Sequence, residues 1–365
     1  MGGIEQFINQ ISRGCVKSGF EIDVLSLSNH KDLRTIEIDG YRAHRVQLDF
    51  EIASTGFSIS AFWRFFQLAK QADIIHYHYP WPFMDMVHFV TRVCKPTVVT
   101  YHSDIIRQLG LLKIYSPLKK KFLSSVRCIV ATSPNYMRSS EVLEKYSDKV
   151  TQITYGLDKA AYPQPDDDRL AFWRERVGDK FFLFIGVLRY YKGLHILLEA
   201  ADGTDYPIVI VGAGPIEQEL YEQVLKLGLR NIHFLGYQSD VDKVALLTLC
   251  YAVVFPSHLR SEAFGISLLE GAMYGKPLIS SEIGTGTTYI NVADETGVVV
   301  PPSDPEQLRQ AMIYLWEHPE QAAEMGKRAE QRYWQLFTAE KMVQSYVELY
   351  REMVENPSVI VKTRL

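Results

Sequence analysis

The chain reads Phe255-Pro256-Ser257-His258-Leu259-Arg260-Ser261-Glu262-Ala263-Phe264-Gly265-Ile266-Ser267-Leu268-Leu269-Glu270 where a predicted strand gives way to a predicted helix. The apolar run that starts at Val253 is broken by Pro256, and apolar residues then recur at helical spacing from Ile266. Two carboxylates therefore lie eight positions apart, Glu262 on the loop and Glu270 about one turn into the helix.

The amides of Phe264, Gly265 and Ile266 lie between these carboxylates, where a helix leaves its first N–H groups unpaired. Such amides suit the hydroxyls or the phosphate of an anionic ligand. One carboxylate can then hold sugar hydroxyls while the other holds a ribose diol. The alternative is that both are helix-start carboxylates favoured only by the helix dipole.

This E-x7-E pattern with its inner Phe-Gly resembles the nucleotide-sugar-dependent retaining glycosyltransferases of family 4. The resemblance implies an α/β protein of the GT-B class, with two facing Rossmann-like domains, parallel sheets and a C-terminal return helix. It also implies that Glu262 contacts the donor sugar and that Glu270 contacts the ribose.

Composition limits the possible classes of protein. The chain has 365 residues, of which 47% are apolar and 22% charged, with a formal net charge of -4. This is typical of a globular protein with two domains, and no basic field of the size that nucleic acid needs is indicated. The four cysteines are widely spaced, which favours reduced thiols over a zinc site or a disulfide framework. We expect a cytoplasmic protein.

Alternating strand-like and helical patterns divide the chain into two α/β sets. The first ends near a stretch rich in proline and aspartate, 162–168, which is typical of a linker. We predict an N-terminal acceptor-binding domain over residues 1–160, a donor-binding domain over 161–335, and a C-terminal helix over 336–365 that packs back on the first domain. The apolar runs predicted as strands are 21–28, 73–79, 97–102, 128–133, 150–155, 181–185, 207–211, 232–235, 252–255, 277–280 and 298–300.

The chain starts with Gly2 and Gly3 entering a helical pattern, although a strand is expected first in such a domain. In family 4 a Gly-Gly turn follows the first strand and closes over the donor diphosphate. The resemblance therefore assigns Gly2 and Gly3 to the donor site. It also leads us to expect an N-terminal domain that lacks its first strand.

The segment from Gly186 to Gly193 follows a buried strand and precedes an amphipathic helix, so it lies at the edge of a sheet where ligands bind. Its cations suit a diphosphate whose charge rises as a glycosidic bond breaks. Lys192 matches the phosphate-binding lysine of the family. Arg189 is assigned beside it, although Val187 occupies the place just after the glycine where the family commonly has an arginine.

His102 ends a predicted strand of the first domain, and the resemblance places it near the donor sugar or the transferring oxygen. In the second domain, the segment 281–288 begins at a strand end and is rich in small donors, among them Thr285 and Thr287. Successive amides and hydroxyls of this kind bind phosphate or sugar oxygens. A structural role is the alternative for His102.

Within the family, the Tyr-His-Ser-Asp sequence at 101–104 and the Gly-Thr-Gly-Thr sequence at 284–287 look most like bacterial O-antigen and related polysaccharide mannosyltransferases or rhamnosyltransferases that use GDP-sugars. The resemblance implies retaining transfer of an α-mannosyl residue from a GDP-sugar to a lipid-linked saccharide. A GDP-rhamnose- or UDP-sugar-dependent transferase is the alternative within the family. A sugar-nucleotide epimerase or an inactive nucleotide-sugar-binding protein is the alternative from another class.

No cofactor and no catalytic metal are predicted. Two D-x-D triplets occur, Asp166 with Asp168 in the predicted linker and Asp240 with Asp242 at a helix start, where capping explains the second. The segment 111–123 mixes basic and apolar residues. It is either a solvated helix face or a peripheral contact with the inner face of the cytoplasmic membrane, where a polyprenyl-linked acceptor would lie.

Overall fold

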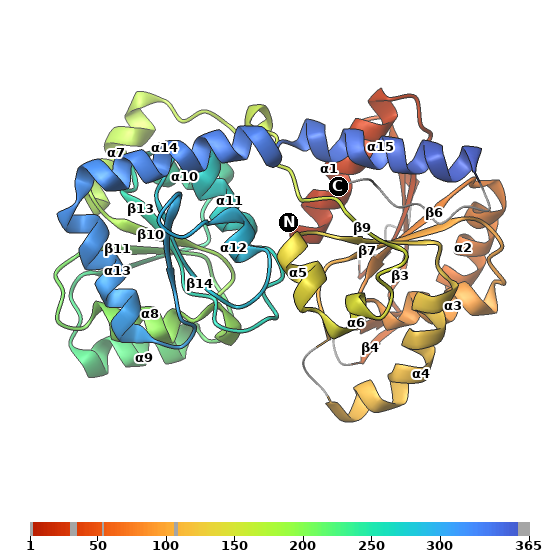
Figure 1. Ribbon diagram of the computed structural model, residues 1–365, viewed down its shortest axis with the longest axis horizontal. Helices are drawn as coiled ribbons and strands as arrows, with labels where there is room; N and C mark the ends of the chain where they lie inside the picture. The colour runs from red at the N-terminus through yellow and green to blue at the C-terminus, as the bar shows by residue number, and fades with distance from the viewer. Residues whose placement is uncertain (1–2, 30–34, 53–54, 106–108, 357–365) are drawn as a thin grey trace. The chain divides into compact units, whose positions relative to one another are not determined.

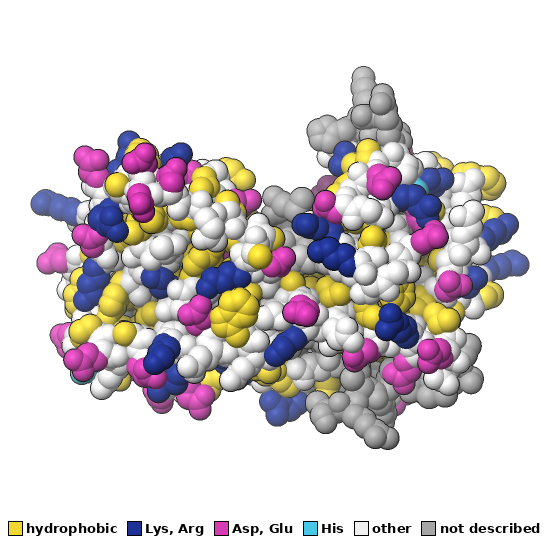
Figure 2. Space-filling view, turned by 90° about the horizontal axis from the view of Figure 1, so that it is seen from above, with side chains coloured by type: hydrophobic (Ala, Val, Ile, Leu, Met, Phe, Trp, Pro, Cys, Tyr) yellow, Lys and Arg dark blue, Asp and Glu magenta, His cyan; other side chains and the backbone are white. Residues whose placement is uncertain are grey.

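The computed structural model describes residues 3–29, 35–52, 55–105 and 109–356, without the side chains of 109–114, and divides into two compact units (Figure 1). Unit 1 runs from the N-terminus to Tyr155 and includes the C-terminal helix from Ala339, and unit 2 covers Gly156–Thr338. Figure 2 shows basic and acidic side chains mixed over one face, in keeping with the small net charge of -4.

Unit 2 is built on a six-stranded parallel sheet with the order β12-β11-β10-β13-β14-β15. The strands coincide with the six predicted apolar runs to within one residue, because a sheet covered on both faces needs continuous β-branched and aromatic residues. They are β10 Phe182–Ile185, β11 Ile208–Val211, β12 Ile232–Gly236, β13 Ala252–Phe255, β14 Leu278–Ser281 and β15 Gly297–Val300.

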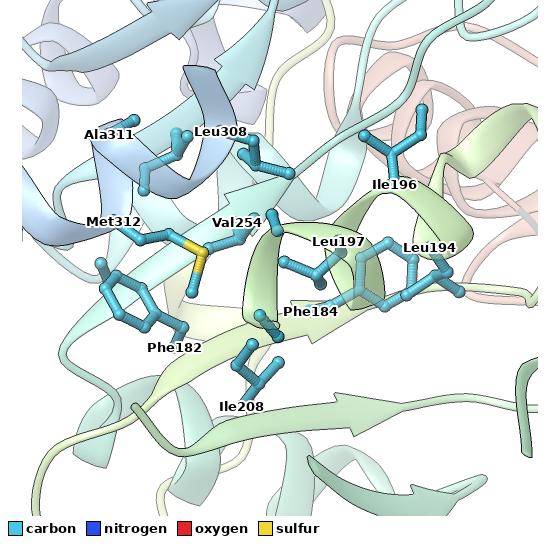
Figure 3. Close-up of a cluster of buried hydrophobic side chains, with 14 of the residues drawn as sticks. Phe182, Phe184, Leu194, Ile196, Leu197, Ile208, Val254, Leu308, Ala311 and Met312 are labelled. Atoms are coloured by element: carbon cyan, nitrogen blue, oxygen red, sulfur yellow. The ribbon is translucent and has the colours of Figure 1, made fainter. Parts of the chain in front are cut away.

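Helices cover both faces of this sheet (Figure 1). In the core, Phe182 and Phe184 of β10 lie with Leu197 of α8 and Met312 of α13 in one fully buried cluster (Figure 3). The helices of unit 2 are α7 Asp167–Val177, α8 Leu194–Ala201, α9 Glu217–Leu227, α10 Asp240–Leu249, α11 Ile266–Met273, α12 Thr287–Ile290, α13 Pro305–Glu317 and α14 Pro319–Leu336, with 3-10 turns η1 Lys159–Ala161 and η2 Tyr190–Lys192.

Unit 1 contains a four-stranded parallel sheet of order β6-β7-β8-β9 and a three-stranded sheet of order β1-β3-β2. Strand β1 pairs with β3 in parallel, and β2 pairs with β3 antiparallel. The strands are β1 Asp23–Ser28, β2 Thr35–Ile38, β3 Tyr41–Gln47, β6 Ile75–Tyr79, β7 Thr97–Tyr101, β8 Cys128–Ala131 and β9 Val150–Gln152, with a hairpin of β4 Phe50–Ile52 and β5 Thr55–Phe57.

The helices of unit 1 include the C-terminal helix α15, which lies beside α1 (Figure 1). The packing is close, since a Cβ added at Gly14 would come within 2.4 Å of a methyl group of Val343. This is the return helix that the GT-B class requires. The helices are α1 Gly3–Lys17, α2 Ile59–Gln71, α3 Pro82–Val90, α4 Leu109–Ser125, α5 Pro134–Ser139, α6 Glu141–Glu144 and α15 Ala339–Glu355.

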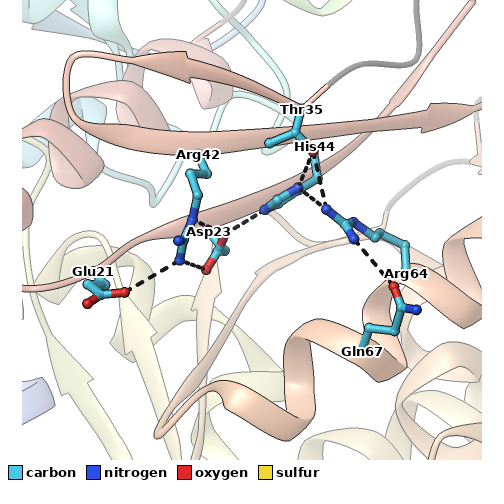
Figure 4. Close-up of polar contacts among 7 residues, drawn as sticks. All are labelled: Glu21, Asp23, Thr35, Arg42, His44, Arg64 and Gln67. Carbon is cyan, nitrogen blue, oxygen red and sulfur yellow. Dashed lines mark hydrogen bonds and ion pairs between the residues drawn. The ribbon is translucent and has the colours of Figure 1, made fainter.

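A polar network joins β1, β3 and α2 (Figure 4). Arg42 donates two hydrogen bonds to Asp23, at 2.9 and 2.8 Å, and Nε2 of His44 lies 2.5 Å from the same carboxylate. The other ring nitrogen of His44 lies 2.7 Å from Nη2 of Arg64 on α2. Burial raises the pKa of Asp23, but the hydrogen bonds and charges of Arg42 and His44 outweigh burial and lower that pKa below its usual value.

Candidate active site

The sheet of unit 2 has its topological switch point between β10 and β13. From β10 the chain moves outward to β11 and β12, and from β13 it moves in the opposite direction to β14 and β15. In open parallel sheets the crevice outside the carboxyl ends of two such strands binds ligands. The loops after β10 and β13 therefore form the candidate site in unit 2, and they carry Lys192 and Glu262.

Gly193 brings these two loops together. It has a φ of +72° and lies so close to the second loop that an added Cβ would be 2.0 Å from the carbonyl oxygen of Pro256. A similar approach holds the loop after β11, where a Cβ on Gly212 would be 1.9 Å from the carbonyl oxygen of Gly186. Only glycine allows the backbones to come this near, so both contacts fix the position of the loop from Gly186 to Gly193.

Lys192 and Glu262 form an ion pair across these loops, from Nζ to Oε2. Each side chain is 12% exposed. The ammonium also lies over the ring of Phe255, 4.8 Å from its centroid, and Ser257 donates a long hydrogen bond of 3.5 Å to the same carboxylate oxygen. The structure thus brings together a cation and a carboxylate, partly shielded from water, at the switch point. Arg189, by contrast, is exposed on the loop after β10.

Glu270 is buried in α11, with 3% of its surface exposed. Among the described residues, its hydrogen bonds come from the hydroxyl of Tyr162 and from Nζ of Lys243, both at 2.9 Å and both to Oε1. Burial opposes the charge of Lys243, but attraction to Glu270 and Asp240 outweighs burial and raises the pKa of that lysine. The side chain of the second glutamate is therefore held in place by groups within unit 2.

Replacing Tyr162 with Phe is expected to lower the free energy of unfolding by about 2 kcal/mol, because a buried carboxylate loses one of its hydrogen bonds. Urea unfolding followed by circular dichroism measures this change. Tyr206→Phe is a matched control, since Tyr206 packs on Trp316 and only its ring is used there. A Tyr162→Phe variant as stable as the Tyr206→Phe variant would show that the hydrogen bond to Glu270 contributes nothing.

The start of α11 presents the predicted amides. Gly265 occupies the N-cap with a φ of +99°, and no side chain caps the helix. Phe264 before it is buried and packs edge-on against Phe337, while Ile266 is the first residue of the helix. Among the described residues, no side chain caps this turn, and binding of a ligand's oxygens by its amides stays a prediction.

The loop after β14 lies against the same segment, because the amide of Gly286 donates to the carbonyl of Ala263 at 2.9 Å. Thr285 and Thr287 are both buried. Thr287 donates to the carbonyl of Ser281 at 3.3 Å, whereas the hydroxyl of Thr285 has no hydrogen-bond partner among the described residues. A buried hydroxyl without a partner costs free energy, and a hydrogen bond to a ligand atom would remove that cost.

Sequence reasoning missed three residues that organise this site. His258 follows β13 and places its ring nitrogens 2.9 Å from the hydroxyl of Ser303 and 3.1 Å from the carbonyl of Tyr190, which ties the loop after β13 to the loop after β10. Lys243 and Tyr162 hold Glu270. The place of His258 just after a strand end was a usable signal, whereas the other two depend on tertiary packing.

In unit 1, His102 follows β7 and is buried. Its Nε2 lies 3.0 Å from Nδ1 of His78, and its Nδ1 is hydrogen-bonded to the hydroxyl of Tyr155. Phe7 of α1 packs edge-on against this ring. Burial, and then the neighbouring His78, hold the pKa of His102 well below its usual value, so the ring is neutral. Both nitrogens are engaged within unit 1.

Gly3 is the first residue of α1, and Gly2 lies outside the described residues. The role of both in donor binding stays a prediction. So does the absence of a metal. Among the residues that the structure describes, no group of three or more His, Cys, Asp or Glu side chains is placed to hold a metal ion. Asp166 caps α7, and Asp242 accepts from the indole of Trp173 at 2.9 Å.

The fold and this site define a transferase of the GT-B class, and comparison with known proteins identifies its family. Residues 1–160 match Glycosyltransferase Family 4, and residues 167–332 match Glycosyl transferases group 1. The chain belongs to the family 4 glycosyltransferases. The predicted family, enzyme class and fold are thereby confirmed.

Two relatives cover nearly the whole chain. D-rhamnosyltransferase WbpZ of Pseudomonas aeruginosa is 63% identical over 93% of this chain and 89% of its own length. O-antigen chain mannosyltransferase C of Escherichia coli is 50% identical over 98% of this chain and 96% of its own length. The two names agree with the predicted group of mannosyltransferases and rhamnosyltransferases.

Solved structures share the fold at low identity. Sucrose-phosphate synthase from Thermosynechococcus elongatus superposes with a TM-score of 0.81, at 21% identity, over 97% of this chain and 94% of that chain. Anabaena HepE in complex with UDP-glucose has a TM-score of 0.76, at 19% identity, over 96% of both chains. Within the described part of the chain, none of the helices has the length and apolar character needed to cross a bilayer.

Proposed function

We propose that the chain transfers an α-mannosyl residue, or its 6-deoxy form, from a GDP-sugar to a lipid-linked saccharide in the synthesis of O-antigen or a related cell-surface polysaccharide. The proposal rests on the Lys192–Glu262 pair at the switch point of the donor-type unit, in a chain half identical to an O-antigen mannosyltransferase. The Thr285 hydroxyl and the start of α11 support it, since both offer donors to a phosphate or a sugar.

In the proposed reaction, the bond between the anomeric carbon and the donor phosphate oxygen breaks while the acceptor hydroxyl bonds to that carbon on the same face. The hydroxyl proton passes to the departing phosphate oxygen, and configuration is retained. Negative charge rises on the diphosphate during this step. An ammonium placed there beforehand stabilises that charge more in a partly dry site than in water, and Lys192 is 12% exposed.

Glu262 exchanges partners in this scheme. It pairs with Lys192 in the structure, and binding of the donor would give the lysine to the diphosphate and the carboxylate to sugar hydroxyls. Glu270 accepts from Tyr162 and Lys243 on Oε1, so Oε2 is the oxygen assigned to the ribose. Arg189 is assigned to the diphosphate as a second cation from the exposed part of the loop.

His102 has a role only by the resemblance. A ring nitrogen of His102 reaches a substrate only when its bond to His78 or to Tyr155 breaks. A histidine that instead serves unit 1 structurally would leave the donor step to Lys192 and Glu262. His102→Gln separates the two roles, because a structural role lowers stability and leaves the KM for the donor unchanged.

The sugar transferred has two candidates. The 50% identical relative is named for mannose and the 63% identical relative for D-rhamnose, which is mannose without its 6-hydroxyl. A site that hydrogen-bonds the 6-hydroxyl rejects the deoxy sugar strongly, whereas an apolar wall there discriminates weakly. Comparing kcat/KM for GDP-mannose and GDP-D-rhamnose therefore decides the sugar.

A panel of nucleotide sugars tests the donor. At a concentration of 100 times Kd, a GDP-sugar is expected to stabilise the native state by about 2.7 kcal/mol, seen as a rise in Tm. UDP- and ADP-sugars at the same concentration are the controls and should leave Tm nearly unchanged. A rise with UDP-sugars alone would contradict the proposed donor. Incubation with the donor and no acceptor tests the epimerase alternative, which predicts conversion of that donor.

A further inference from the structure

An apolar hollow lies on the surface of unit 1, between α2 and the end of α3. It has a volume of about 360 Å³ and is lined by Ile59, Phe62, Trp63, Phe66, Val90, Thr91 and Arg92. Three of its large apolar side chains are mostly in water, with exposed fractions of 78% for Ile59, 66% for Trp63 and 65% for Val90. We call these three residues the α2–α3 patch.

This exposure is costly for a protein in water. Ile59 and Trp63 lie four positions apart on α2, so they share one face of that helix. Single exposed apolar residues are ordinary, but a contiguous group around a hollow marks a surface that another apolar phase covers. A tryptophan beside branched aliphatic side chains is the composition of surfaces that insert shallowly at a bilayer interface.

The charges near the patch are mostly basic, with Asp49 as an acidic exception, since its Oδ2 accepts from the amide of Ile59 at 2.7 Å. Residues 52–72 and 86–103, which contain α2 and most of α3, hold no aspartate or glutamate, although the whole chain has a net charge of -4. Nζ of Lys70 lies 4.3 Å from the ring centroid of Phe66, and Arg92 lines the hollow itself. An apolar centre with a basic rim complements the negative surface of an anionic bilayer.

The neighbouring helix extends this basic rim. Residues 105–140, which include α4, also contain no acidic residue. Lys120 and Lys121 of α4 are exposed, and Nζ of Lys121 lies 4.7 Å from the ring centroid of Phe89 on α3. The predicted membrane segment 111–123 lies on α4, but the side chains of its residues 111–114 are outside the described part. Lys121 of that segment thus borders α3.

We propose that the α2–α3 patch docks the protein on an anionic membrane surface, with Ile59, Trp63 and Val90 entering the interface and Lys70, Arg92 and Lys121 facing lipid headgroups. The proposal rests on the proposed function, because an acceptor carried on a lipid is available only at a membrane. It adds to that function the surface by which the enzyme reaches the bilayer.

Flotation of the full chain with vesicles of phosphatidylcholine and phosphatidylglycerol tests this surface. The wild type is expected to float with these vesicles at low salt and to be released at high salt or from pure phosphatidylcholine. The double variant Ile59→Ser/Trp63→Ser should lower the bound fraction about tenfold or more. Lys70→Glu/Arg92→Glu should also lower the bound fraction. This loss should grow as the vesicles contain more phosphatidylglycerol.

A matched control exists on α9 of unit 2, where Tyr221 and Leu225 are also four positions apart and are 40% and 80% exposed. Tyr221→Ser/Leu225→Ser should float like the wild type. An equal loss of flotation in Ile59→Ser/Trp63→Ser and in Tyr221→Ser/Leu225→Ser would overturn the proposal. So would a wild type that does not float. So would a concentration-dependent dimer that only Ile59→Ser/Trp63→Ser abolishes, because the patch would then bind a second copy of the chain.

A soluble acceptor analogue separates this inference from the proposed function. Ile59→Ser/Trp63→Ser should transfer sugar to a short saccharide acceptor without a lipid at the wild-type rate, yet lose activity on a vesicle-borne acceptor. If no variant transfers any sugar while flotation still depends on the patch, the proposed reaction is wrong and the docking surface stands. Loss of transfer to the soluble acceptor in the patch variant alone would contradict the docking role.

Discussion

We expect Lys192→Met to lower kcat/KM by about 10³-fold, with the fold of unit 2 kept and its stability lowered, because Glu262 loses its ion-pair partner. The reason is the charge that develops on the donor diphosphate as the glycosidic bond breaks. Removing one preorganised donor from such a site typically costs about 10²–10³ in rate, and a full charge in a partly dry site is at the upper end. Lys192 is assigned to that position because it lies at the switch point of the sheet and its side chain is 12% exposed.

Most of this loss should appear in kcat, because the interaction strengthens only as the bond breaks. Glu262→Gln should also lower kcat/KM, through loss of sugar orientation. The double variant should cost less than the product of the two single losses, since the two side chains contact each other in the structure. Steady-state kinetics with saturating acceptor measure all three variants.

Lys226→Met is the matched control, because Lys226 is an exposed lysine in the last turn of α9 and the substitution is the same. It should retain wild-type kcat and KM. A Lys192→Met enzyme with more than about a third of the wild-type kcat/KM would contradict the role assigned to this lysine, since the change would be under 1 kcal/mol. Circular dichroism excludes unfolding as the cause of a loss.

The sequence was sufficient for the sheet of unit 2 because its central strands β10, β11 and β13 are apolar runs buried on both faces. It was not sufficient for residues 35–57 of unit 1, where β2 to β5 were not predicted. Strand β3 reads Tyr-Arg-Ala-His-Arg-Val-Gln, and its buried His44 is compensated by Asp23 and Arg64 from other elements (Figure 4). Such compensation is tertiary and leaves no apolar periodicity.

The candidate site shows the same division. Lys192 and Glu262 could be found because each follows a buried strand, and the carboxyl ends of neighbouring parallel strands meet at one edge. The partners of Glu270 could not be found from the sequence, because one of them, Tyr162, lies in the stretch 162–168 that reads as a linker. That stretch belongs to unit 2, with Tyr162 buried and Asp166 capping α7. The aspartates of this stretch lie at the start of α7 and not in a linker.

Asp85 is expected to make the stability of the protein depend on pH. This carboxyl lies in the first turn of α3, is 2% exposed, and accepts a hydrogen bond from the hydroxyl of Tyr115. Burial raises its pKa from 3.8 to about 7, and the hydrogen bond from Tyr115 opposes that rise without cancelling it. The native state therefore keeps this proton up to about pH 7, whereas the unfolded chain releases it near pH 4.

The sign follows from this difference in bound protons. Between about pH 4 and pH 7 the native state binds more protons at Asp85 than the unfolded state, so the free energy of unfolding falls as pH rises through this window. A rise in pKa from 3.8 to about 7 corresponds to a loss of about 4 kcal/mol over the window. Above the folded pKa both states are ionised, and this contribution stays constant.

Asp85→Asn removes the ionisation and keeps a similar shape, with an oxygen that can accept from Tyr115. Near pH 4.5 the variant and the wild type should therefore have similar stability, and by pH 8 the variant should be more stable by up to about 4 kcal/mol. Urea unfolding at several pH values measures the difference. Asp205→Asn, at an exposed position of unit 2, should instead follow the wild type at every pH. Parallel curves for Asp85→Asn and the wild type would mean that the carboxylate of Asp85 carries its charge without cost, and burial would not be the cause assigned above.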